Sequence, residues 1–344
     1  MSLKFTDLKQ DGYERVLLAE ESLTGFYSII AIHNTKRGPA LGGCRFFGYQ
    51  GEDDQKKDVL KLSKAMTYKN SLADLDFGGG KATINSRVSK NKMYELYGKM
   101  LDHLDGSYIT AGDIGIVDQD LVELKKYSNY VCSTKGTDSG QSTAYGVFNA
   151  ILGYNEFKYD SSSIENKKIV LKGFGKVGSR LAHFCKEVGA IVEVVDFESN
   201  RSLIENAGFK FLSKYQNTSF DSIDIFSPCA TGGDLNTEFI EFANSVKIDC
   251  VIGAANNQLE NNTIEKNLFD MGITFCPDYC VNAGGVIILA LRSSIKEDME
   301  YLDTEAKNKL IGIKNQLIKI LTLSKEKNQL TTVSSNELAE AGFQ

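Results

Sequence analysis

From about Lys167 onward, short apolar runs alternate with amphipathic segments. The runs KKIVL, AIVEVVD, FDSIDIFSP, VKIDCVIG and GITFCP are typical of short buried strands. Between the first two, KVGSRLAHFCKEVG has the spacing of an amphipathic helix that ends at a glycine. This alternation of strands and helices predicts a parallel, doubly wound sheet of the Rossmann type.

The pattern before Lys167 is different. Residues 26–33 (FYSIIAIH) predict a strand, and residues 54–72 have helical periodicity. One face of a further helix is marked by four positions: Tyr94, Tyr97, Leu101 and Leu104. The segment 299–325 predicts a long helix, and a last helix, NELAEAGF, is expected to return the chain towards the first domain.

We therefore expect an α/β protein of two domains. The first is an α/β domain made of residues 1–140 together with residues 326–344. The second, over residues 141–325, is a Rossmann dinucleotide-binding domain. A chain of 344 residues is long enough for each domain to bury its own core.

Composition and charge narrow the class of protein. With 42% hydrophobic and 24% charged residues, the chain is typical of a globular cytoplasmic protein. The net charge of −6 and the lack of Lys/Arg-rich runs argue against nucleic acid as a partner. No apolar run approaches the roughly 20 residues that cross a bilayer, and the N-terminal residues lack the apolar stretch of a signal peptide. We expect neither a nucleic-acid nor a membrane partner.

Cysteine and histidine give no sign of a disulfide framework, a metal site or a catalytic triad. The seven cysteines are scattered and odd in number. Cys276 and Cys280 are close, but no histidine or second pair lies near enough to complete a zinc site. None of His33, His103 and His183 has a carboxylate or nucleophile at a suggestive spacing. We expect small buried thiols and no metal.

A glycine-rich turn follows the strand KKIVL and opens the next helix. Gly173, Gly175 and Gly178 form G-x-G-x-x-G, which allows a tight turn, close approach of a pyrophosphate and close helix packing. Asp196 ends the next strand, where a carboxylate would accept hydrogen bonds from ribose hydroxyls and repel a 2′-phosphate. This favours NAD, although Arg201 nearby leaves NADP open. The alternative is a glycine-rich turn that binds nothing.

Three glycine-rich segments in the first half indicate chemistry. Residues 38–43 (GPALGG) predict a loop almost free of side chains, and residues 76–81 (DFGGGK) present Lys81 from a run of glycines. Residues 110–115 (TAGDIG) present Asp113 after an apolar strand. Because glycine weakens helices and strands, such a concentration indicates unusual backbone angles or close approach of a ligand.

Lys69, Lys81 and Asp113 together suit the oxidation of an amine. A substrate carboxylate needs a fixed cation, and attack of water on an imine needs a base with a lowered pKa. A carboxylate must then move protons to and from the substrate nitrogen, while a nicotinamide takes the hydride. An isolated lysine is usually a solvated surface residue, which remains the alternative for Lys69.

At these residues the chain resembles the glutamate/leucine/phenylalanine/valine dehydrogenase family, most closely its leucine dehydrogenases. The resemblance covers nearly the whole chain and is carried by GPALGG, MTYKN, FGGGK, TAGDIG, STAYGV, GFGKVG, SPCA, GAANNQL and PDYCVNAGGV. It implies an active site in a cleft between the two domains and assembly through the first domain. A homo-oligomer, either a dimer or an octamer, is therefore expected.

The resemblance also implies roles for single residues. Lys81 would be the catalytic lysine, Asp113 its acid/base partner, and Lys69 the ligand of the substrate carboxylate. The substrate would further meet Leu41, Gly42, Gly43, Ala111, Asn282, Val286 and Leu289. Thr143 and Asn256 would hold the nicotinamide carboxamide, and the full set of cofactor-binding residues would be Thr143, Gly173, Gly175, Lys176, Val177, Gly178, Asp196, Cys229, Ala230, Ala254 and Asn256.

The side-chain pocket implied by this alignment is apolar. Glutamate dehydrogenases carry a lysine at the position of Leu41 and a serine near Leu289, whereas here both are aliphatic, so a buried substrate carboxylate would be unfavourable. We expect NAD-dependent, reversible deamination of leucine, valine or isoleucine to the 2-oxo acid and ammonia. The alternatives are phenylalanine or tryptophan dehydrogenase of the same family, or a non-catalytic nucleotide-binding relative. A 2-hydroxy-acid or opine-type dehydrogenase would usually need a catalytic histidine.

Overall fold

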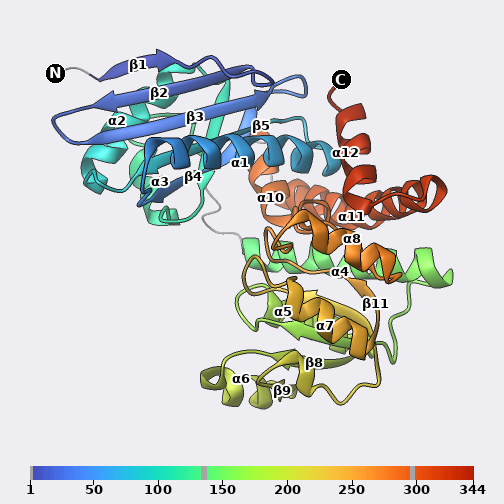
Figure 1. The fold of residues 1–344 in the computed structure, drawn as a ribbon. Helices are drawn as coiled ribbons and strands as arrows, with labels where there is room; N and C mark the ends of the chain where they lie inside the picture. The colour runs from blue at the N-terminus through green and yellow to red at the C-terminus, as the bar shows by residue number, and fades with distance from the viewer. Residues whose placement is uncertain (1–2, 133–137, 295–298) are drawn as a thin grey trace. The chain divides into compact units, whose positions relative to one another are not determined.

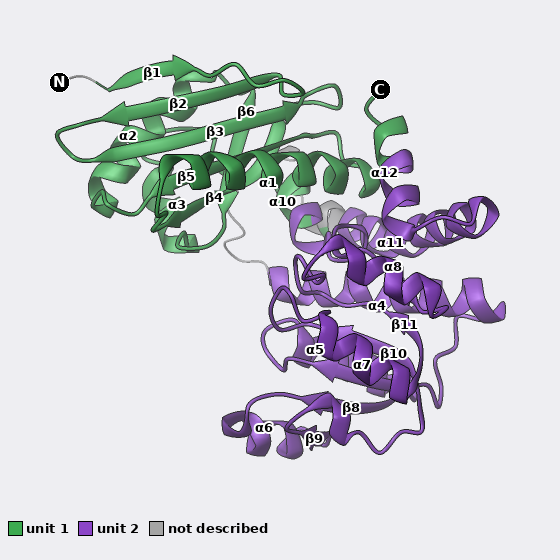
Figure 2. Ribbon diagram, viewed as in Figure 1, with its two compact units in different colours: residues 1–137, 288–303, 339–344 green, residues 138–287, 304–338 purple. Residues whose placement is uncertain are grey.

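The computed structural model describes residues 3–132, 138–294 and 299–344, and these fall into two compact units. Unit 1 consists of residues 1–137, 288–303 and 339–344, and unit 2 of residues 138–287 and 304–338 (Figure 2). Each unit contains a six-stranded sheet, and Figure 1 shows helices beside the sheet in both units. None of the helices in the described ranges has the length and apolarity that crossing a membrane requires.

Unit 1 is a mixed sheet covered by helices. Its elements are β1 (Lys4–Asp7), β2 (Arg15–Glu21), β3 (Phe26–Asn34), β4 (Ala40–Phe47), α1 (Glu52–Leu72), β5 (Gly78–Asn85), α2 (Lys90–His103), β6 (Tyr108–Gly112) and α3 (Asp118–Leu124). The strand order is β1-β2-β3-β5-β4-β6. Strand β4 is parallel to both β5 and β6, whereas β3 is antiparallel to β5.

The two faces of this sheet have separate cores, because successive strand residues point to opposite faces. On β2, Leu17 and Ala19 join the core beneath α2, whereas Val16 packs with Val59 of α1. The predicted strand over residues 26–33 and the helix over 54–72 are confirmed as β3 and α1. The helix marked by Tyr94 and Tyr97 is confirmed as α2.

Two of the glycine-rich segments contribute strands, and for the first of them, residues 38–43, we predicted a loop. Residues 40–47 form β4, and residues 78–85 form β5, in which every residue is buried. In β5 glycine is needed for a steric reason, because a Cβ on Gly79 would lie 2.0 Å from the backbone nitrogen of Thr67 in α1. The glycines of β5 therefore let α1 pack directly on the backbone of the sheet.

Unit 2 is an entirely parallel sheet with helices. Its first elements are α4 (Ser139–Tyr159), β7 (Lys168–Lys172), α5 (Gly178–Glu187), β8 (Ile191–Val195), η1 (Glu198–Asn200), α6 (Arg201–Asn206), β9 (Lys210–Leu212) and η2 (Tyr215–Asn217). They are followed by β10 (Ser222–Pro228), α7 (Thr237–Ser245), β11 (Lys247–Val251), α8 (Asn262–Asp270), β12 (Thr274–Phe275) and α9 (Asp278–Val281). The sheet order β9-β8-β7-β10-β11-β12 is that of dinucleotide-binding folds, with its switch point between β7 and β10. The predicted doubly wound fold is confirmed.

The chain ends with three helices that the division into units cuts. These are α10 (Gly284–Ser294), α11 (Met299–Lys327) and α12 (Thr331–Ala341). We expected residues 326–344 to belong to the first domain, but residues 326–338 group with unit 2, because Thr331 at the start of α12 hydrogen-bonds Glu265 and the carbonyl of Phe275. The last six residues group with unit 1, where the carbonyl of Ala339 accepts a hydrogen bond from Ser71.

We predict that Gly79→Ala destabilises unit 1, because the added methyl group overlaps the backbone of α1. The free energy of unfolding should fall by about 1–3 kcal/mol, measured by denaturant titration. The control is Gly312→Ala in α11, where a Cβ meets nothing within 4 Å and alanine favours the helix. Equal stability of the two variants would contradict this packing argument.

Candidate functional site

Unit 1 brings together Lys81 and Asp113, which lie 32 positions apart in the sequence. Lys81 is on β5, Asp113 follows the last residue of β6, and β4 runs between these strands. Lys81 Nζ lies 2.6 Å from Asp113 Oδ2, and the two side chains are 9% and 22% exposed. The two residues form an ion pair in which the lysine is nearly buried. The pair is exposed to solvent mainly at the carboxylate of Asp113.

Glycines of β4 make this meeting possible. A Cβ on Gly43 would lie 3.0 Å from Cβ of Asp113, and a Cβ on Gly42 would lie 1.8 Å from the carbonyl oxygen of Gly80. From the buried side, the hydroxyl of Tyr108 donates to the carbonyl of Gly42 at 2.7 Å. Larger residues at Gly42 and Gly43 would push apart the strands that carry the pair.

Asp113 is held in its ionised form. Burial alone would raise the pKa of this carboxyl group, but the charge and hydrogen bond of Lys81, with the charge of Arg45, lower the pKa below its usual value. At neutral pH the site therefore contains an ionised carboxylate in contact with a lysine. Such a pair can hold and exchange protons with a ligand bound beside it.

Arg45 is a site residue that we did not predict. Its Nε donates to Asp113 Oδ2 at 3.0 Å, and its Nη1 donates to Asp58 Oδ2 at 3.0 Å. Asp58 also accepts a hydrogen bond of 2.7 Å from the hydroxyl of Tyr49. The one signal in the sequence is the strand period of two, which places Arg45 on the same face of β4 as Gly43.

The other predicted residues of unit 1 lie in the same strands or beside them. Lys69 is half-buried in the last turn of α1. Its neighbour Asn70 donates to the carbonyls of Gly78 at 2.6 Å and Leu41 at 3.4 Å, which fixes this end of α1 on β5 and β4. Leu41 and Ala111 are buried in β4 and β6.

Two further residues of the predicted substrate pocket lie in α10. Leu289 is half-buried in unit 1, where its carbonyl oxygen accepts a hydrogen bond from Cys132 Sγ at 3.2 Å. Val286 is buried in unit 2. All seven cysteines lie in the described ranges and are free thiols, six of them buried.

In unit 2 the glycine-rich turn connects β7 with α5, as predicted. Gly173 has φ of +102°, and a Cβ there would lie 2.7 Å from the nitrogen of Ala230. A Cβ on Gly178 would lie 1.9 Å from the carbonyl oxygen of Gly173, so this residue also needs to be glycine. Gly175 meets nothing within 4 Å, which leaves open space in front of the turn. The turn therefore fits a pyrophosphate, whose charge the amino end of α5 favours.

Asp196, directly after β8, is fixed by three donors. Its Oδ2 accepts from the backbone N–H of Phe174 at 2.5 Å. Its Oδ1 accepts from the N–H of Phe197 at 2.7 Å and from the side chain of Asn200 at 2.9 Å. The half-buried carboxylate is thereby tied to the glycine-rich turn, where a ribose adjoining the pyrophosphate would lie.

Further predicted cofactor residues follow the carboxyl ends of β10 and β11. The N–H of Cys229 donates to the carbonyl of Lys172 at the end of β7. Asn282 donates to the carbonyl of Ala254 at 3.0 Å and to Asn256 Oδ1 at 2.8 Å. The buried Oδ1 of Asn282 accepts no hydrogen bond within the described part of the chain. This amide oxygen is suited to accept from a ligand amide or ammonium group.

Thr143, Lys176 and Val177 lie around the start of α4 and α5. Thr143 Oγ1 donates to the carbonyl of Ser139, and Lys176 Nζ lies 3.8 Å from Asp138 Oδ1. Val177 is the residue that precedes α5. These contacts place Lys176, whose side chain is 62% exposed, beside the first turn of α4.

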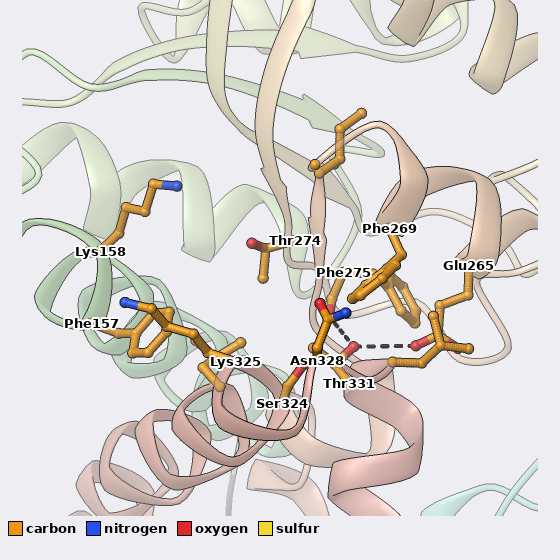
Figure 3. A pocket seen from close by; sticks show the side chains of 14 residues that line it. Phe157, Lys158, Glu265, Phe269, Thr274, Phe275, Ser324, Lys325, Asn328 and Thr331 are labelled. Carbon is orange, nitrogen blue, oxygen red and sulfur yellow. Dashed lines mark hydrogen bonds between the residues drawn. The ribbon is translucent and has the colours of Figure 1, made fainter.

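A separate pocket of about 270 Å³ lies in unit 2, away from the predicted residues. It is lined by the end of α4, by α8 and β12, and by the end of α11, including Phe157, Phe269, Thr274 and Lys325 (Figure 3). Its carboxylate, Glu265, accepts hydrogen bonds from Thr331 and Thr332 at the start of α12. That carboxylate therefore has a structural role.

Comparison with known proteins places the chain among amino-acid dehydrogenases. The chain matches the Glu/Leu/Phe/Val dehydrogenase dimerisation domain over residues 15–129 and the Glutamate/Leucine/Phenylalanine/Valine dehydrogenase domain over residues 196–342. Phenylalanine dehydrogenase from Thermoactinomyces intermedius is 39% identical over 83% of this chain and 80% of that protein. Leucine dehydrogenase from Geobacillus stearothermophilus is 35% identical over 98% of this chain and 92% of that protein.

A solved structure agrees with these matches. L-Tryptophan dehydrogenase from Nostoc punctiforme is 31% identical, with a TM-score of 0.85 over 96% of both chains. These matches support an oxidoreductase of the class that acts on CH–NH2 groups. The chain belongs to the glutamate/leucine/phenylalanine/valine dehydrogenase family, and the resemblance seen in the sequence is confirmed.

We predict that Asp113 stabilises the fold in a pH-dependent manner. Because its pKa is lowered in the folded state, the ion pair contributes fully above the unfolded pKa of about 3.9, and the contribution is lost as pH falls through the folded pKa. The difference in unfolding free energy between wild type and Asp113→Asn should therefore be constant near neutrality and shrink below about pH 4.

The control for this measurement is Asp74→Asn, since Asp74 pairs with Arg37 but is 86% exposed. Its loss should change stability by less than about 1 kcal/mol at any pH. A pH-independent difference for Asp113→Asn would contradict the lowered pKa.

Proposed function

We propose that the protein is an NAD-dependent dehydrogenase that reversibly deaminates an apolar L-amino acid to its 2-oxo acid and ammonia. The observation that carries this proposal is the 2.6 Å pair of Lys81 and Asp113, in which the lysine is almost fully buried. A buried lysine lowers the stability of the fold unless its charge is paired. Because the paired carboxylate is partly exposed, a ligand can still reach the ion pair from that side.

In this proposal Lys81 and Asp113 handle the protons of the reaction. Lys81 deprotonates the water that attacks the substrate imine and stabilises the resulting carbinolamine oxygen. Asp113 first accepts a proton from the substrate ammonium group and later returns it to the nitrogen of the carbinolamine, so that the C–N bond breaks, the C=O bond forms and ammonia leaves. Lys69 holds the substrate carboxylate. When bound, a nicotinamide dinucleotide supplies the acceptor for the hydride from C2 of the amino acid.

The charges around Asp196 support NAD over NADP. Arg201, which could accept a 2′-phosphate, pairs with Glu198 at 2.5 Å and with Glu205 at 3.4 Å. Its guanidinium also lies over the ring of Phe211, at 4.4 Å from the centroid. Within the described part of the chain, Asp196 forms no ion pair, and in this proposal its carboxylate repels a 2′-phosphate.

The proposed substrate is branched-chain: leucine, valine or isoleucine. Leu41, Ala111, Val286 and Leu289 are the residues proposed to meet its side chain, and all four are aliphatic. Discrimination per methylene is only about 1–3 kcal/mol, so overlapping substrates are expected. An aromatic substrate is the second candidate, because two of the relatives are named phenylalanine and tryptophan dehydrogenase.

We propose further that the protein is a homo-oligomer, a dimer or an octamer. Support comes from the family model over residues 15–129, which describes a dimerisation domain. Light scattering of the purified protein measures the number of subunits directly.

The proposal predicts a reaction that depends on Lys81. Purified protein should reduce NAD with leucine, valine and isoleucine, and Lys81→Met should lower turnover by about 10²–10⁴-fold, because the base is lost. The control is Lys90→Met, which removes a 2.6 Å pair with Asp120 in the same unit. Rates are followed as NADH absorbance with a panel of L-amino acids.

Three outcomes of this panel are informative. Turnover of phenylalanine or tryptophan alone would select the aromatic candidate. Nucleotide binding without turnover of any amino acid would select the non-catalytic relative. Wild-type rates in a folded Lys81→Met variant would refute the role of Lys81.

Asp196 sets the cofactor preference in this proposal. Asp196→Ser should weaken NADH binding roughly tenfold or more, because charge-assisted hydrogen bonds to the ribose are lost. The dissociation constants of NADH and NADPH should therefore become more similar. Dissociation constants are measured by fluorescence titration of each cofactor. The control is Asp221→Ser, because Asp221 directly precedes the amino end of β10, whereas Asp196 follows the carboxyl end of β8. An unchanged NADH-to-NADPH ratio would contradict the assignment.

A further inference from the structure

Arg45 connects the Lys81–Asp113 pair to a second carboxylate. Its Nε binds Asp113 Oδ2, while its Nη1 contacts both oxygens of Asp58, at 3.2 and 3.0 Å. Asp58 is on α1 and Asp113 follows β6, so a single side chain from β4 joins three elements. Arg45 is 20% and Asp58 27% exposed, which keeps the charges only partly solvated.

We propose that Arg45 is a positioning residue for Asp113, which it holds at the same oxygen as Lys81 through a guanidinium anchored on Asp58. The inference rests on the proposed function, in which Asp113 exchanges protons with the substrate. It assigns to Arg45 no contact with the substrate. What it adds is the reason that the Asp113 carboxyl group keeps its orientation while protons move between Lys81, Asp113 and the substrate.

Two side-chain donors on Asp113 come from neighbouring strands, and the backbone N–H of Ile114 is a further donor. Lys81 Nζ and Arg45 Nε both contact Oδ2, at 2.6 and 3.0 Å. A carboxylate held by one lysine alone can rotate about its Cβ–Cγ bond when that lysine loses its proton. The second, permanently charged donor prevents this, since a guanidinium is not deprotonated in proteins.

The anchor at the other end explains why an arginine is needed. Tyr49 is 9% exposed, and its hydroxyl fixes Asp58 Oδ2, so the carboxylate that holds Arg45 is itself held. A guanidinium can direct Nε to one carboxylate and Nη1 to another in a rigid plane. An ammonium group is a single point charge on a flexible stem and cannot keep both contacts in this geometry.

Other ionisable groups also face Asp113. On the strands, Lys81, Arg45, Cys44 and Tyr108 interact with Asp113, and beyond Arg45 lie Asp58 of α1 and Tyr49. Cys44 and Tyr108 are buried, and burial raises the pKa of each, so both stay neutral near pH 7. The charges that lower the pKa of Asp113 are therefore those of Lys81 and Arg45.

Three substitutions give three different signatures. Arg45→Gln removes the positive charge and should raise the pKa of Asp113, because the ionised form loses a partner. Arg45→Lys keeps the charge but not the geometry, so turnover should fall roughly tenfold to a hundredfold while the pKa of Asp113 stays close to that of wild type. Asp58→Asn removes a negative charge and should lower the pKa of Asp113, with a reduced turnover.

The measurements are the pKa of the Asp113 carboxyl, by carbon-13 NMR titration of labelled aspartate, and kcat and KM for leucine across pH. The Asp113 signal is assigned by its loss in Asp113→Asn. Thermal unfolding checks the fold of each variant. The matched control is Arg15→Gln, which removes a paired arginine from β2, where Arg15 binds Asp7 at 2.7 Å. This control should leave the pKa of Asp113 and turnover unchanged.

The proposal is supported if kcat falls with little change in KM, and if the pKa of Asp113 moves in opposite directions in Arg45→Gln and Asp58→Asn. It is overturned if folded Arg45→Lys and Asp58→Asn retain kcat within twofold and leave the pKa of Asp113 unchanged. If Arg45→Gln does not fold, Arg45→Lys and Asp58→Asn still test the proposal. The NMR titration needs no substrate, so a wild-type protein inactive with every amino acid would defeat the proposed function separately from this coupling.

Discussion

The buried contact between Lys81 and Asp113 is the constraint on which the rest of unit 1 depends. An unpaired charge as deeply buried as Lys81 would cost several kcal/mol, so the fold must deliver a carboxylate to it. The carboxylate of Asp113 after β6, two strands away, pairs with it, and the strand between them must carry no bulky side chain at this point. Gly42 and Gly43 satisfy that requirement, and the buried hydroxyl of Tyr108 holds the resulting backbone from behind.

Glycines also allow close backbone contacts in unit 2. There the glycine-rich turn brings the backbone of β7 against Ala230 and leaves space in front of Gly175. Asp196 closes the turn by accepting the N–H of Phe174. In both units, glycines at the predicted site lie where two backbones approach closely. The charged groups of the site, Asp113 in unit 1 and Asp196 in unit 2, lie beside these contacts. This arrangement suits small, highly charged ligands whose reacting atoms must come close to the main chain.

Much of unit 2 could be predicted from the sequence, because its strands are apolar runs bounded by turns and its order follows from the handedness of βα units. Unit 1 was harder. Strands β4 and β5 carry five glycines, which lower strand propensity, and only their packing against α1 and Tyr108 makes them strands. Lys81 and Asp113 were predicted, since each stands beside glycines. Arg45 was not, because its partners Asp58 and Asp113 are found only through tertiary structure.

The central claim is that Lys81 and Asp113 act together on the carbon that carries the amino group. The most direct measurement is a crystal structure of the protein with NADH and a 2-oxo acid such as 4-methyl-2-oxopentanoate, without ammonia, so that no turnover occurs. The account predicts that Lys81 Nζ lies within hydrogen-bonding distance of the C2 carbonyl oxygen, with Asp113 still in contact with Lys81. A 2-oxo acid bound away from both side chains, with the pair intact and unliganded, would contradict it.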